Sequence, residues 1–276
     1  AGIGTYQLFQ ETYHKPTYAK LHRGPKADYE RQITAPDRAF EAGIDDVGIG
    51  ALFGLYDWRF DILGLIAHAQ YLEEKHGVGP HTISVPRFKP AQTVCFKPVP
   101  VLDEDFLKAI AVLRLSVPYT GMILSTREAP ALRHKAFEIG ISQASAASVT
   151  EPGGYGGKER SAAQFEVADH RSLDEVVAAL CRQGFLPSFC TACYRSGRTG
   201  CDFMELAKTG AIQDLCTPNA ALTFKEYLLD HASPETCEEG EKRLEKEVSK
   251  IGDAATGKEL SKRLKRLEAG ERDLYF

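Results

Sequence analysis

Short apolar runs alternate with longer stretches of helical periodicity along the first half of the chain. The runs predict five β-strands, over residues 5–12, 47–55, 81–85, 121–125 and 141–145. The stretches between them predict four helices, over residues 28–42, 58–75, 103–115 and 131–139. Gly43 follows the first of these helices, and Gly77 and Pro80 follow the second, as expected of residues that stop a helix.

This alternation indicates consecutive βα units, and therefore an α/β fold with a parallel sheet. Two architectures remain open: an open doubly wound sheet or part of a (β/α)8 barrel. A full barrel needs eight units, and the chain begins at Ala1, without Met, close to its first predicted strand. We therefore expect the C-terminal part of a longer polypeptide, with about three βα units upstream if the parent is a barrel.

After the fifth predicted strand the character of the sequence changes. A glycine-rich stretch (Gly153, Gly154, Gly156, Gly157) is followed by mostly helical sequence that carries most of the cysteines. We expect a boundary near residue 165, with the later units of the barrel in 1–165 and a helical domain in 166–276. From Pro234 onward, dense Glu and Lys with leucines at helical intervals predict a pair of solvated surface helices.

Charge and hydropathy exclude several classes of partner. The 276 residues hold 34 Lys and Arg against 38 Asp and Glu, a net charge of -4, so no basic excess exists to neutralise a nucleic acid backbone. We find neither an apolar run long enough to span a bilayer nor a secretory signal. The expected setting is the reducing cytoplasm, without nucleic acid or membrane partners.

The cysteines point to metal or redox chemistry in the C-terminal part. Seven cysteines are too few for a disulfide scaffold, and only Cys95 precedes residue 180. Cys190, Cys193 and Cys216 form a C-x2-C-x22-C pattern, in which a tight turn can bring the first two sulfurs to one metal. Structural zinc would need a fourth ligand, such as Cys201 or His231. Spacing alone leaves zinc and an iron–sulfur cluster open, while the count of three favours a cluster with one open iron.

Polar residues at the predicted strand ends are candidates for ligand contacts, because barrel chemistry gathers there. Glu11 can hydrogen-bond a ribose diol, or it is simply a surface residue. Arg127 offers a planar fork for a carboxylate, or it forms a salt bridge with the adjacent Glu128. Arg31 and Arg38 on the first predicted helix are equally compatible with solvated positions.

His68 lies in the second predicted helix, beside the apolar Leu65 and Ile66. Taken alone, such a histidine is more often packed and hydrogen-bonded than bound to a metal.

Several longer strings resemble the radical S-adenosylmethionine tyrosine lyases. These are FQETYHKPTYAKLH (9–22), VGIGALFGLYDWR (47–59), GPHTISVPR (79–87), LSTRE (124–128) and GISQASAAS (140–148). The C-terminal strings SFCTACYRSGRTG and ERDLYF resemble the members of that family that mature FeFe-hydrogenase. The resemblance covers essentially the whole chain, and the barrel strings and C-terminal strings support it independently.

The resemblance implies a radical barrel that cleaves the Cα–Cβ bond of L-tyrosine to p-cresol and dehydroglycine. It further implies that the fragment becomes CO and cyanide on an auxiliary 4Fe–4S cluster with an additional iron, for delivery to other hydrogenase maturation proteins. The implied cofactors are S-adenosylmethionine, this auxiliary cluster and a second 4Fe–4S cluster that cleaves S-adenosylmethionine.

The resemblance also assigns metal ligands. Cys190, Cys193 and Cys216 would hold the auxiliary cluster, whose open iron binds a free cysteine bridging to the additional iron. His68 matches the family histidine that ligates that additional iron, which reverses the interpretation from its local surroundings.

The remaining assignments concern organic ligands. Glu11 and Arg31 match positions that contact the ribose and the methionine carboxylate of S-adenosylmethionine. Arg127 would anchor the tyrosine carboxylate, with Ser125 and Ser142 as neighbours at the fourth and fifth strand ends.

One family feature is absent: the C-x3-C-x2-C motif that holds the radical-generating cluster occurs nowhere in the 276 residues. We therefore expect this chain alone to be inactive, and the intact polypeptide or a companion fragment to be needed. A non-catalytic iron–sulfur or zinc-binding module is the alternative. A relative of the thiamine-pathway lyase is disfavoured, because the C-terminal cysteine pattern is not expected there.

Overall fold

A computed structural model of the chain describes residues 4–91, 96–151, 154 and 163–276. Cys95 and three of the four glycines of the glycine-rich stretch lie outside these ranges. The chain folds into two compact units, Ala1–His170 with Thr199–Met204 and Arg171–Arg198 with Glu205–Phe276. The expected domain boundary near residue 165 remains a prediction.

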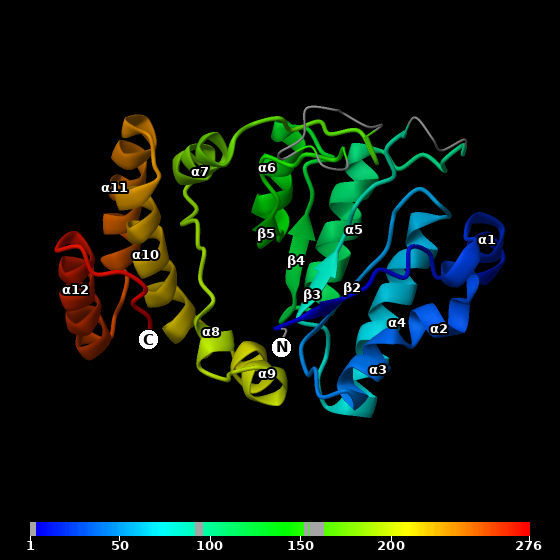
Figure 1. Cartoon of the computed structure of the whole chain (residues 1–276), viewed down its shortest axis with the longest axis horizontal. Helices are drawn as coiled ribbons and strands as arrows, with labels where there is room; N and C mark the ends of the chain where they lie inside the picture. Colours follow the sequence, from blue (N-terminus) through cyan, green and yellow to red (C-terminus); the bar gives the residue numbers. More distant parts are fainter. Residues whose placement is uncertain (1–3, 92–95, 152–153, 155–162) are drawn as a thin grey trace. The chain divides into compact units, whose positions relative to one another are not determined.

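The first unit contains a parallel five-stranded sheet in the order β1-β2-β3-β4-β5. Its strands are β1 (Tyr6–Gln7), β2 (Val47–Gly50), β3 (Thr82–Ser84), β4 (Gly121–Leu124) and β5 (Gln143–Ala144). Figure 1 shows β2 to β5 following one another across the sheet. The predicted α/β fold with five parallel strands is confirmed.

The strand order decides between the two architectures that the sequence left open. A doubly wound sheet reverses its order at a switch point, whereas this sheet adds each new strand beside the previous one. Because βα crossovers are right-handed, strands added always on the same side keep their helices on one face, as in a barrel. The first unit therefore corresponds to consecutive units of a barrel.

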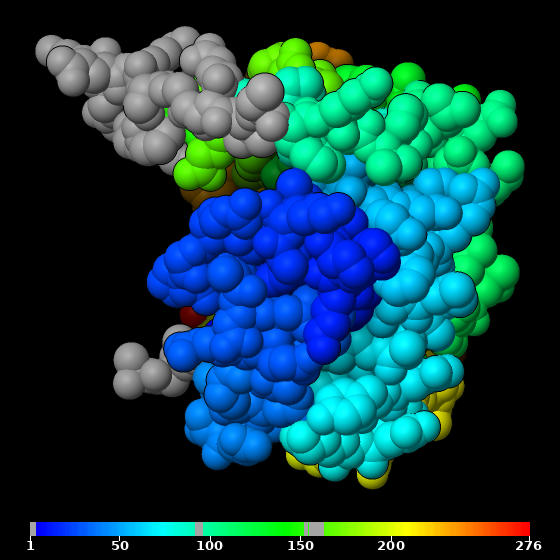
Figure 2. All heavy atoms as spheres, turned by 90° about the vertical axis from the view of Figure 1, so that its right-hand side faces the viewer, coloured from blue at the N-terminus to red at the C-terminus, as the bar shows by residue number. Residues whose placement is uncertain are grey.

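Six α-helices are described in the first unit. They are α1 (Lys15–Leu21), α2 (Tyr29–Ile33), α3 (Ala35–Glu41), α4 (Trp58–His76), α5 (Asp103–Ser116) and α6 (Pro130–Ile139). Figure 2 shows the chain of α1 to α4, in blue and cyan, on the side that faces the viewer. The predicted helices at 58–75, 103–115 and 131–139 match α4, α5 and α6 closely.

Two local features differ from the prediction. The helix predicted over 28–42 is broken at Thr34, because Pro36 in the first turn of α3 cannot donate the backbone hydrogen bond that would continue α2. Helix α1 was not predicted, since Tyr18 is its only buried residue and no apolar periodicity marks it.

The second unit is helical. It contains α7 (Leu173–Arg182), α8 (Ala192–Arg195), the second half of α9 (Gly200–Thr209), α10 (Gln213–Asp230), α11 (Pro234–Val248) and α12 (Ala254–Glu268). The last two are the predicted helices after Pro234, although Leu244, Leu260 and Leu267 are buried in the core of the unit. Among the described helices, none combines the length and apolar character of a membrane span.

Candidate strand-end and cysteine sites

Arg127 follows strand β4, at the carboxyl end of the sheet. Its Nη1 donates to the backbone oxygen of Arg87 at 3.3 Å, and its guanidinium lies 3.7 Å from the ring centroid of Phe165. Its backbone N–H donates to the Ser125 hydroxyl at 3.3 Å, which fixes the turn after β4. Within the described residues, most of the guanidinium N–H groups of Arg127 have no hydrogen-bond acceptor.

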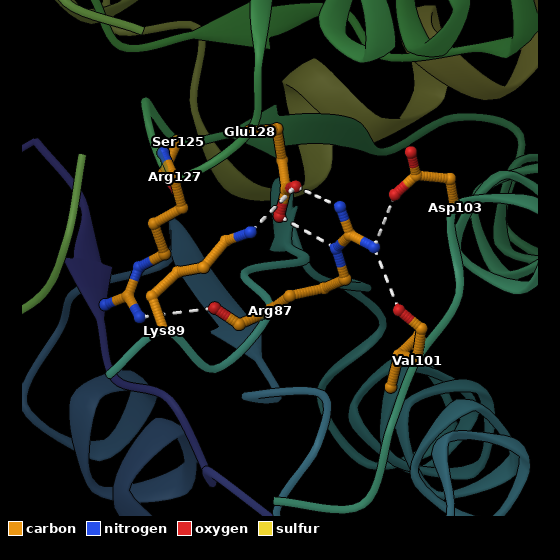
Figure 3. A network of polar contacts seen from close by, with 7 residues as sticks. All are labelled: Arg87, Lys89, Val101, Asp103, Ser125, Arg127 and Glu128. Carbon is orange, nitrogen blue, oxygen red and sulfur yellow. Dashed lines mark hydrogen bonds and ion pairs between the residues drawn. The ribbon is translucent and has the colours of Figure 1, made fainter. Parts of the chain in front are cut away.

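Glu128, the neighbour of Arg127, is engaged elsewhere. Its carboxylate accepts from both Nε (3.0 Å) and Nη2 of Arg87, and the Lys89 ammonium lies 3.6 Å away (Figure 3). Arg87 also donates to Asp103 at 2.8 Å. Among the described residues no ion pair joins Arg127 to Glu128, so the salt-bridge interpretation of Arg127 is wrong. The Arg87–Glu128 pair leaves the fork of Arg127 available.

Charge near Arg127 is incompletely balanced. Burial lowers the pKa of Arg127, while the charges of Glu11 and Glu128 partly oppose that shift. Glu11 is therefore near enough to act on Arg127, although its own ion pair is with Lys26 at 2.5 Å. Glu11 adopts a φ of 69°, a left-handed conformation that a residue with a side chain holds only under constraint. Strained backbone beside a buried cation is typical of a ligand site.

The other candidate residues for organic ligands are more dispersed. Ser142 lies before β5, where its hydroxyl accepts from the backbone N–H of Met122 at 3.0 Å, so it stands at the amino end of that strand. Arg31 and Arg38 are both exposed. Arg38 Nη2 donates to the backbone oxygen of Arg31 at 2.7 Å. The backbone N–H of Arg31 donates to Oδ1 of Asp28, which caps the helix.

Tyr13 and His68 form a buried pair. The Tyr13 hydroxyl lies 2.9 Å from Nδ1 of His68, and a Cβ on Gly64 would lie only 2.3 Å from Tyr13 Cγ, so Gly64 is the gap that admits the tyrosine ring. Burial lowers the pKa of His68 to about 4, which keeps its imidazole neutral. Nε2 of His68 is buried without a hydrogen-bond partner among the described residues. Histidine ligands commonly use one ring nitrogen for the metal and the other for a hydrogen bond, so this arrangement fits a ligand.

Sequence reasoning missed two buried polar residues, Asp61 and Gln10. Asp61 on α4 accepts from the Thr12 hydroxyl at 2.9 Å and from the Tyr13 backbone N–H at 2.8 Å, and burial raises its pKa to about 6. Gln10 is 2% exposed, and neither of its side-chain amide atoms has a partner among the described residues. The only available signal for Gln10 was its place beside Glu11 at a strand end.

The three cysteines of the C-x2-C-x22-C pattern all belong to the second unit. Cys190 lies just before α8 and Cys193 lies inside it, while Cys216 lies in the first turn of α10. The Ala192 N–H donates to the Cys190 sulfur at 3.3 Å. Cys216 is an exposed residue, but partial desolvation of its thiol, together with the nearby Cys193 and Cys190, raises its pKa to about 11. The three thiols are thus near enough to interact electrostatically.

Whether these residues fit a cluster depends on both donors and geometry. Three thiols and an N–H donor to sulfur are the groups that stabilise iron–sulfur clusters, so the donor set fits. As placed, the described residues contain no group of three or more Cys, His, Asp or Glu side chains in position to hold a metal ion. A three-cysteine ligand set would therefore require the thiols to come closer together than they are placed here.

Of the two candidate fourth zinc ligands, His231 lies far from Cys216. His231 caps the far end of α10, fifteen residues after Cys216, which is about 22 Å along a helix. Cys201 is exposed and belongs to the first unit. The length of the helix therefore excludes His231 as a fourth ligand beside Cys216.

Known proteins resemble the chain in sequence and in fold. Residues 84–186 match the model of the Biotin and Thiamin Synthesis associated domain. The chain is 38% identical to 2-iminoacetate synthase of Escherichia coli over 189 residues, which are 67% of this chain and 50% of that protein. The enzyme of the same name from Salmonella typhimurium is 37% identical over the same shares of both chains. The chain thus spans about half the length of these relatives.

Solved structures give a fuller match. A crystal structure of HydG, described as a maturase of the [FeFe]-hydrogenase, superposes with a TM-score of 0.95 and 55% identity, over 100% of this chain and 61% of that one. HydG of Carboxydothermus hydrogenoformans superposes with a TM-score of 0.79 and 47% identity, over 95% of this chain and 57% of that one.

These similarities define the class of the protein: a parallel α/β unit and a helical C-terminal part, related to 2-iminoacetate synthases. Within that class, the match to HydG over the whole chain is the stronger. The chain is thus similar to part of HydG over its whole length, and the resemblance that its sequence motifs indicated is confirmed.

Proposed function

We propose that the protein containing this chain is a radical S-adenosylmethionine tyrosine lyase that serves FeFe-hydrogenase maturation in the reducing cytoplasm. It cleaves the Cα–Cβ bond of L-tyrosine to p-cresol and dehydroglycine, and the fragment yields CO and cyanide for assembly of the hydrogenase active site. The observation that carries this proposal is the 55% identity to a HydG maturase across the whole chain.

The strand-end residues would bind the organic ligands. The fork of Arg127 suits the tyrosine carboxylate, because two parallel N–H groups can donate to its two oxygens. Ser125 holds the turn on which Arg127 stands. In the same proposal Glu11 contacts the ribose of S-adenosylmethionine and Arg31 its methionine carboxylate, while Ser142 is a more distant neighbour.

The cysteines of the second unit would hold the auxiliary cluster. Cys190, Cys193 and Cys216 would supply three thiolates, and a free cysteine would bind the open iron. Neutral His68 would ligate the additional iron through Nε2. When bound, S-adenosylmethionine on a second 4Fe–4S cluster supplies the radical, and the auxiliary cluster with its additional iron supplies the place where the diatomic products are collected.

The alternative is a non-catalytic iron–sulfur or zinc module that uses the same cysteines. Both functions predict metal binding, but only the lyase predicts turnover of tyrosine. Other hydrogenase maturation proteins would be the receiving partners of the lyase.

A product assay separates the two functions. The chain is supplied together with the region that carries the expected C-x3-C-x2-C motif, without oxygen, with a reductant, S-adenosylmethionine and ring-labelled tyrosine. The lyase forms labelled p-cresol and CO, and both require S-adenosylmethionine. Full loading with iron and no p-cresol would refute the lyase and leave the module.

A further inference from the structure

A chain of hydrogen bonds joins the turn of Cys193 to the helix of Cys216 through the last residue, Phe276. The backbone N–H of Arg198 donates to the Cys193 carbonyl at 2.9 Å, and Nη2 of Arg198 donates to the backbone oxygen of Phe276 at 3.1 Å. Arg198, Phe276 and Asn219 together are called the brace below.

The other half of the brace reaches α10. The Phe276 N–H donates to Oδ1 of Asn219 at 2.8 Å, and Nδ2 of Asn219 donates to the Leu215 carbonyl at 2.8 Å. Leu215 immediately precedes Cys216. Asn219 is 2% exposed, and both ends of its amide are used, so its orientation is fixed.

The segment around the brace is held independently. Arg195 pairs with both oxygens of Asp273, one of them at 2.9 Å, and stacks 4.3 Å from the Tyr275 ring centroid. The guanidinium of Arg263 lies 4.1 Å from the Phe276 ring centroid. The tail therefore has its own anchors, so loss of the Arg198 side chain should cut one link without releasing the tail.

We propose that Arg198 is the positioning residue of the three-cysteine site: through the brace it holds the turn of Cys190 and Cys193 at the correct distance from Cys216. The proposal rests on the cysteine site of the proposed function.

Two variants test the link from Arg198 to Phe276. Arg198→Gln removes the guanidinium that donates to the Phe276 backbone oxygen, whereas Arg198→Lys can still donate to that oxygen. Arg182→Gln is the matched control, because Arg182 is a half-exposed arginine on α7 whose partner is Glu235. All variants are first checked for an unchanged melting temperature.

The first measurement needs no cluster. In a Cys190→Ser background, phenylarsine oxide can bridge Cys193 and Cys216, and a Cys190→Ser/Cys216→Ser variant gives the background binding. Loss of one charge-assisted hydrogen bond predicts about tenfold weaker binding for Arg198→Gln. Arg198→Lys and Arg182→Gln should remain within about twofold of the parent.

The second measurement follows iron in the protein reconstituted without oxygen. Arg198→Gln should lose iron to a chelator about tenfold faster than the parent, and Arg198→Lys should restore most of the retention. Equal arsenical binding and equal iron loss in Arg198→Gln and Arg182→Gln would overturn the proposal. Arsenical binding that depends on Arg198, with no iron uptake by the unaltered protein, would keep the brace and refute the cluster in the proposed function.

Discussion

Replacing Arg127 should strongly reduce turnover of tyrosine without unfolding the protein. Arg127→Gln removes the guanidinium, and with it both N–H donors that the proposed carboxylate contact requires. Hydrogen bonds to charged groups contribute about 1.5–3 kcal/mol each, so two lost bonds predict a fall in kcat/KM for tyrosine of about 10² to 10⁴-fold. Arg127→Lys keeps a charge and one donor, so its fall should be about 10 to 100-fold.

The expected stability of the variant also follows from the contacts of Arg127. Its side chain makes one 3.3 Å hydrogen bond and a stacking contact with Phe165, so Arg127→Gln should change the free energy of unfolding by only about 1 kcal/mol. Arg87→Gln is the contrasting control. It leaves Glu128, 1% exposed, without its main partner, which should cost about 3 kcal/mol.

The assay measures p-cresol at several tyrosine concentrations, beside urea unfolding of each variant. The account predicts that Arg127→Gln loses activity and keeps its stability, while Arg87→Gln loses stability. Unchanged kcat/KM in Arg127→Gln would refute the anchoring role. A loss of activity that merely follows a loss of folded protein would refute the argument that the contacts of Arg127 contribute little to stability.

Three further predictions test other parts of the account. Cys190→Ser or Cys193→Ser should spare p-cresol but suppress CO, and a parallel loss of both products in a folded variant would refute the separation of the two chemistries. Burial raises the pKa of Asp61 from 3.8 to about 6, so the charged carboxylate destabilises the folded state above that pH. Asp61→Asn should therefore raise the free energy of unfolding at pH 8 by up to about 3 kcal/mol and leave it unchanged at pH 4. Urea titrations at the two pH values check this. Gly240→Ala should cost about 1–3 kcal/mol, because its Cβ would lie 2.5 Å from a Leu228 methyl group. At Gly257 on α12 an added Cβ would have no neighbouring atom within 4 Å, so Gly257→Ala should instead stabilise the folded protein by about 0.5–1 kcal/mol. Thermal melts compare the two variants.

The βα units were predictable because their signals are local. The periodicity of α4 and its stop at Gly77 are written in adjacent residues, and Gly77 adopts the φ of 73° that such a stop needs. The strand ends were predictable by the same logic, which singled out Arg127. The short helix α1 was not, because it is stabilised by its surroundings rather than by a periodic apolar face.

The partners of the candidate residues were not predictable, because they are distant in the sequence. Glu128 pairs with Arg87, 41 residues away, and not with its neighbour Arg127. Arg198 contacts Phe276, 78 residues away. A single sequence carries no local signal for such pairs, so the C-x2-C turn was visible from its spacing while the brace beside it was not.

Metal content is the most direct test of the claim that three cysteines of this chain hold an iron–sulfur cluster. The iron and zinc contents are measured, and electron paramagnetic resonance spectra are recorded, on the chain reconstituted without oxygen. A variant that lacks Cys190, Cys193 and Cys216 is measured beside it. The account predicts about four or five irons per chain and a reduced-cluster signal, both lost in the variant. About one zinc per chain with no uptake of iron would contradict it.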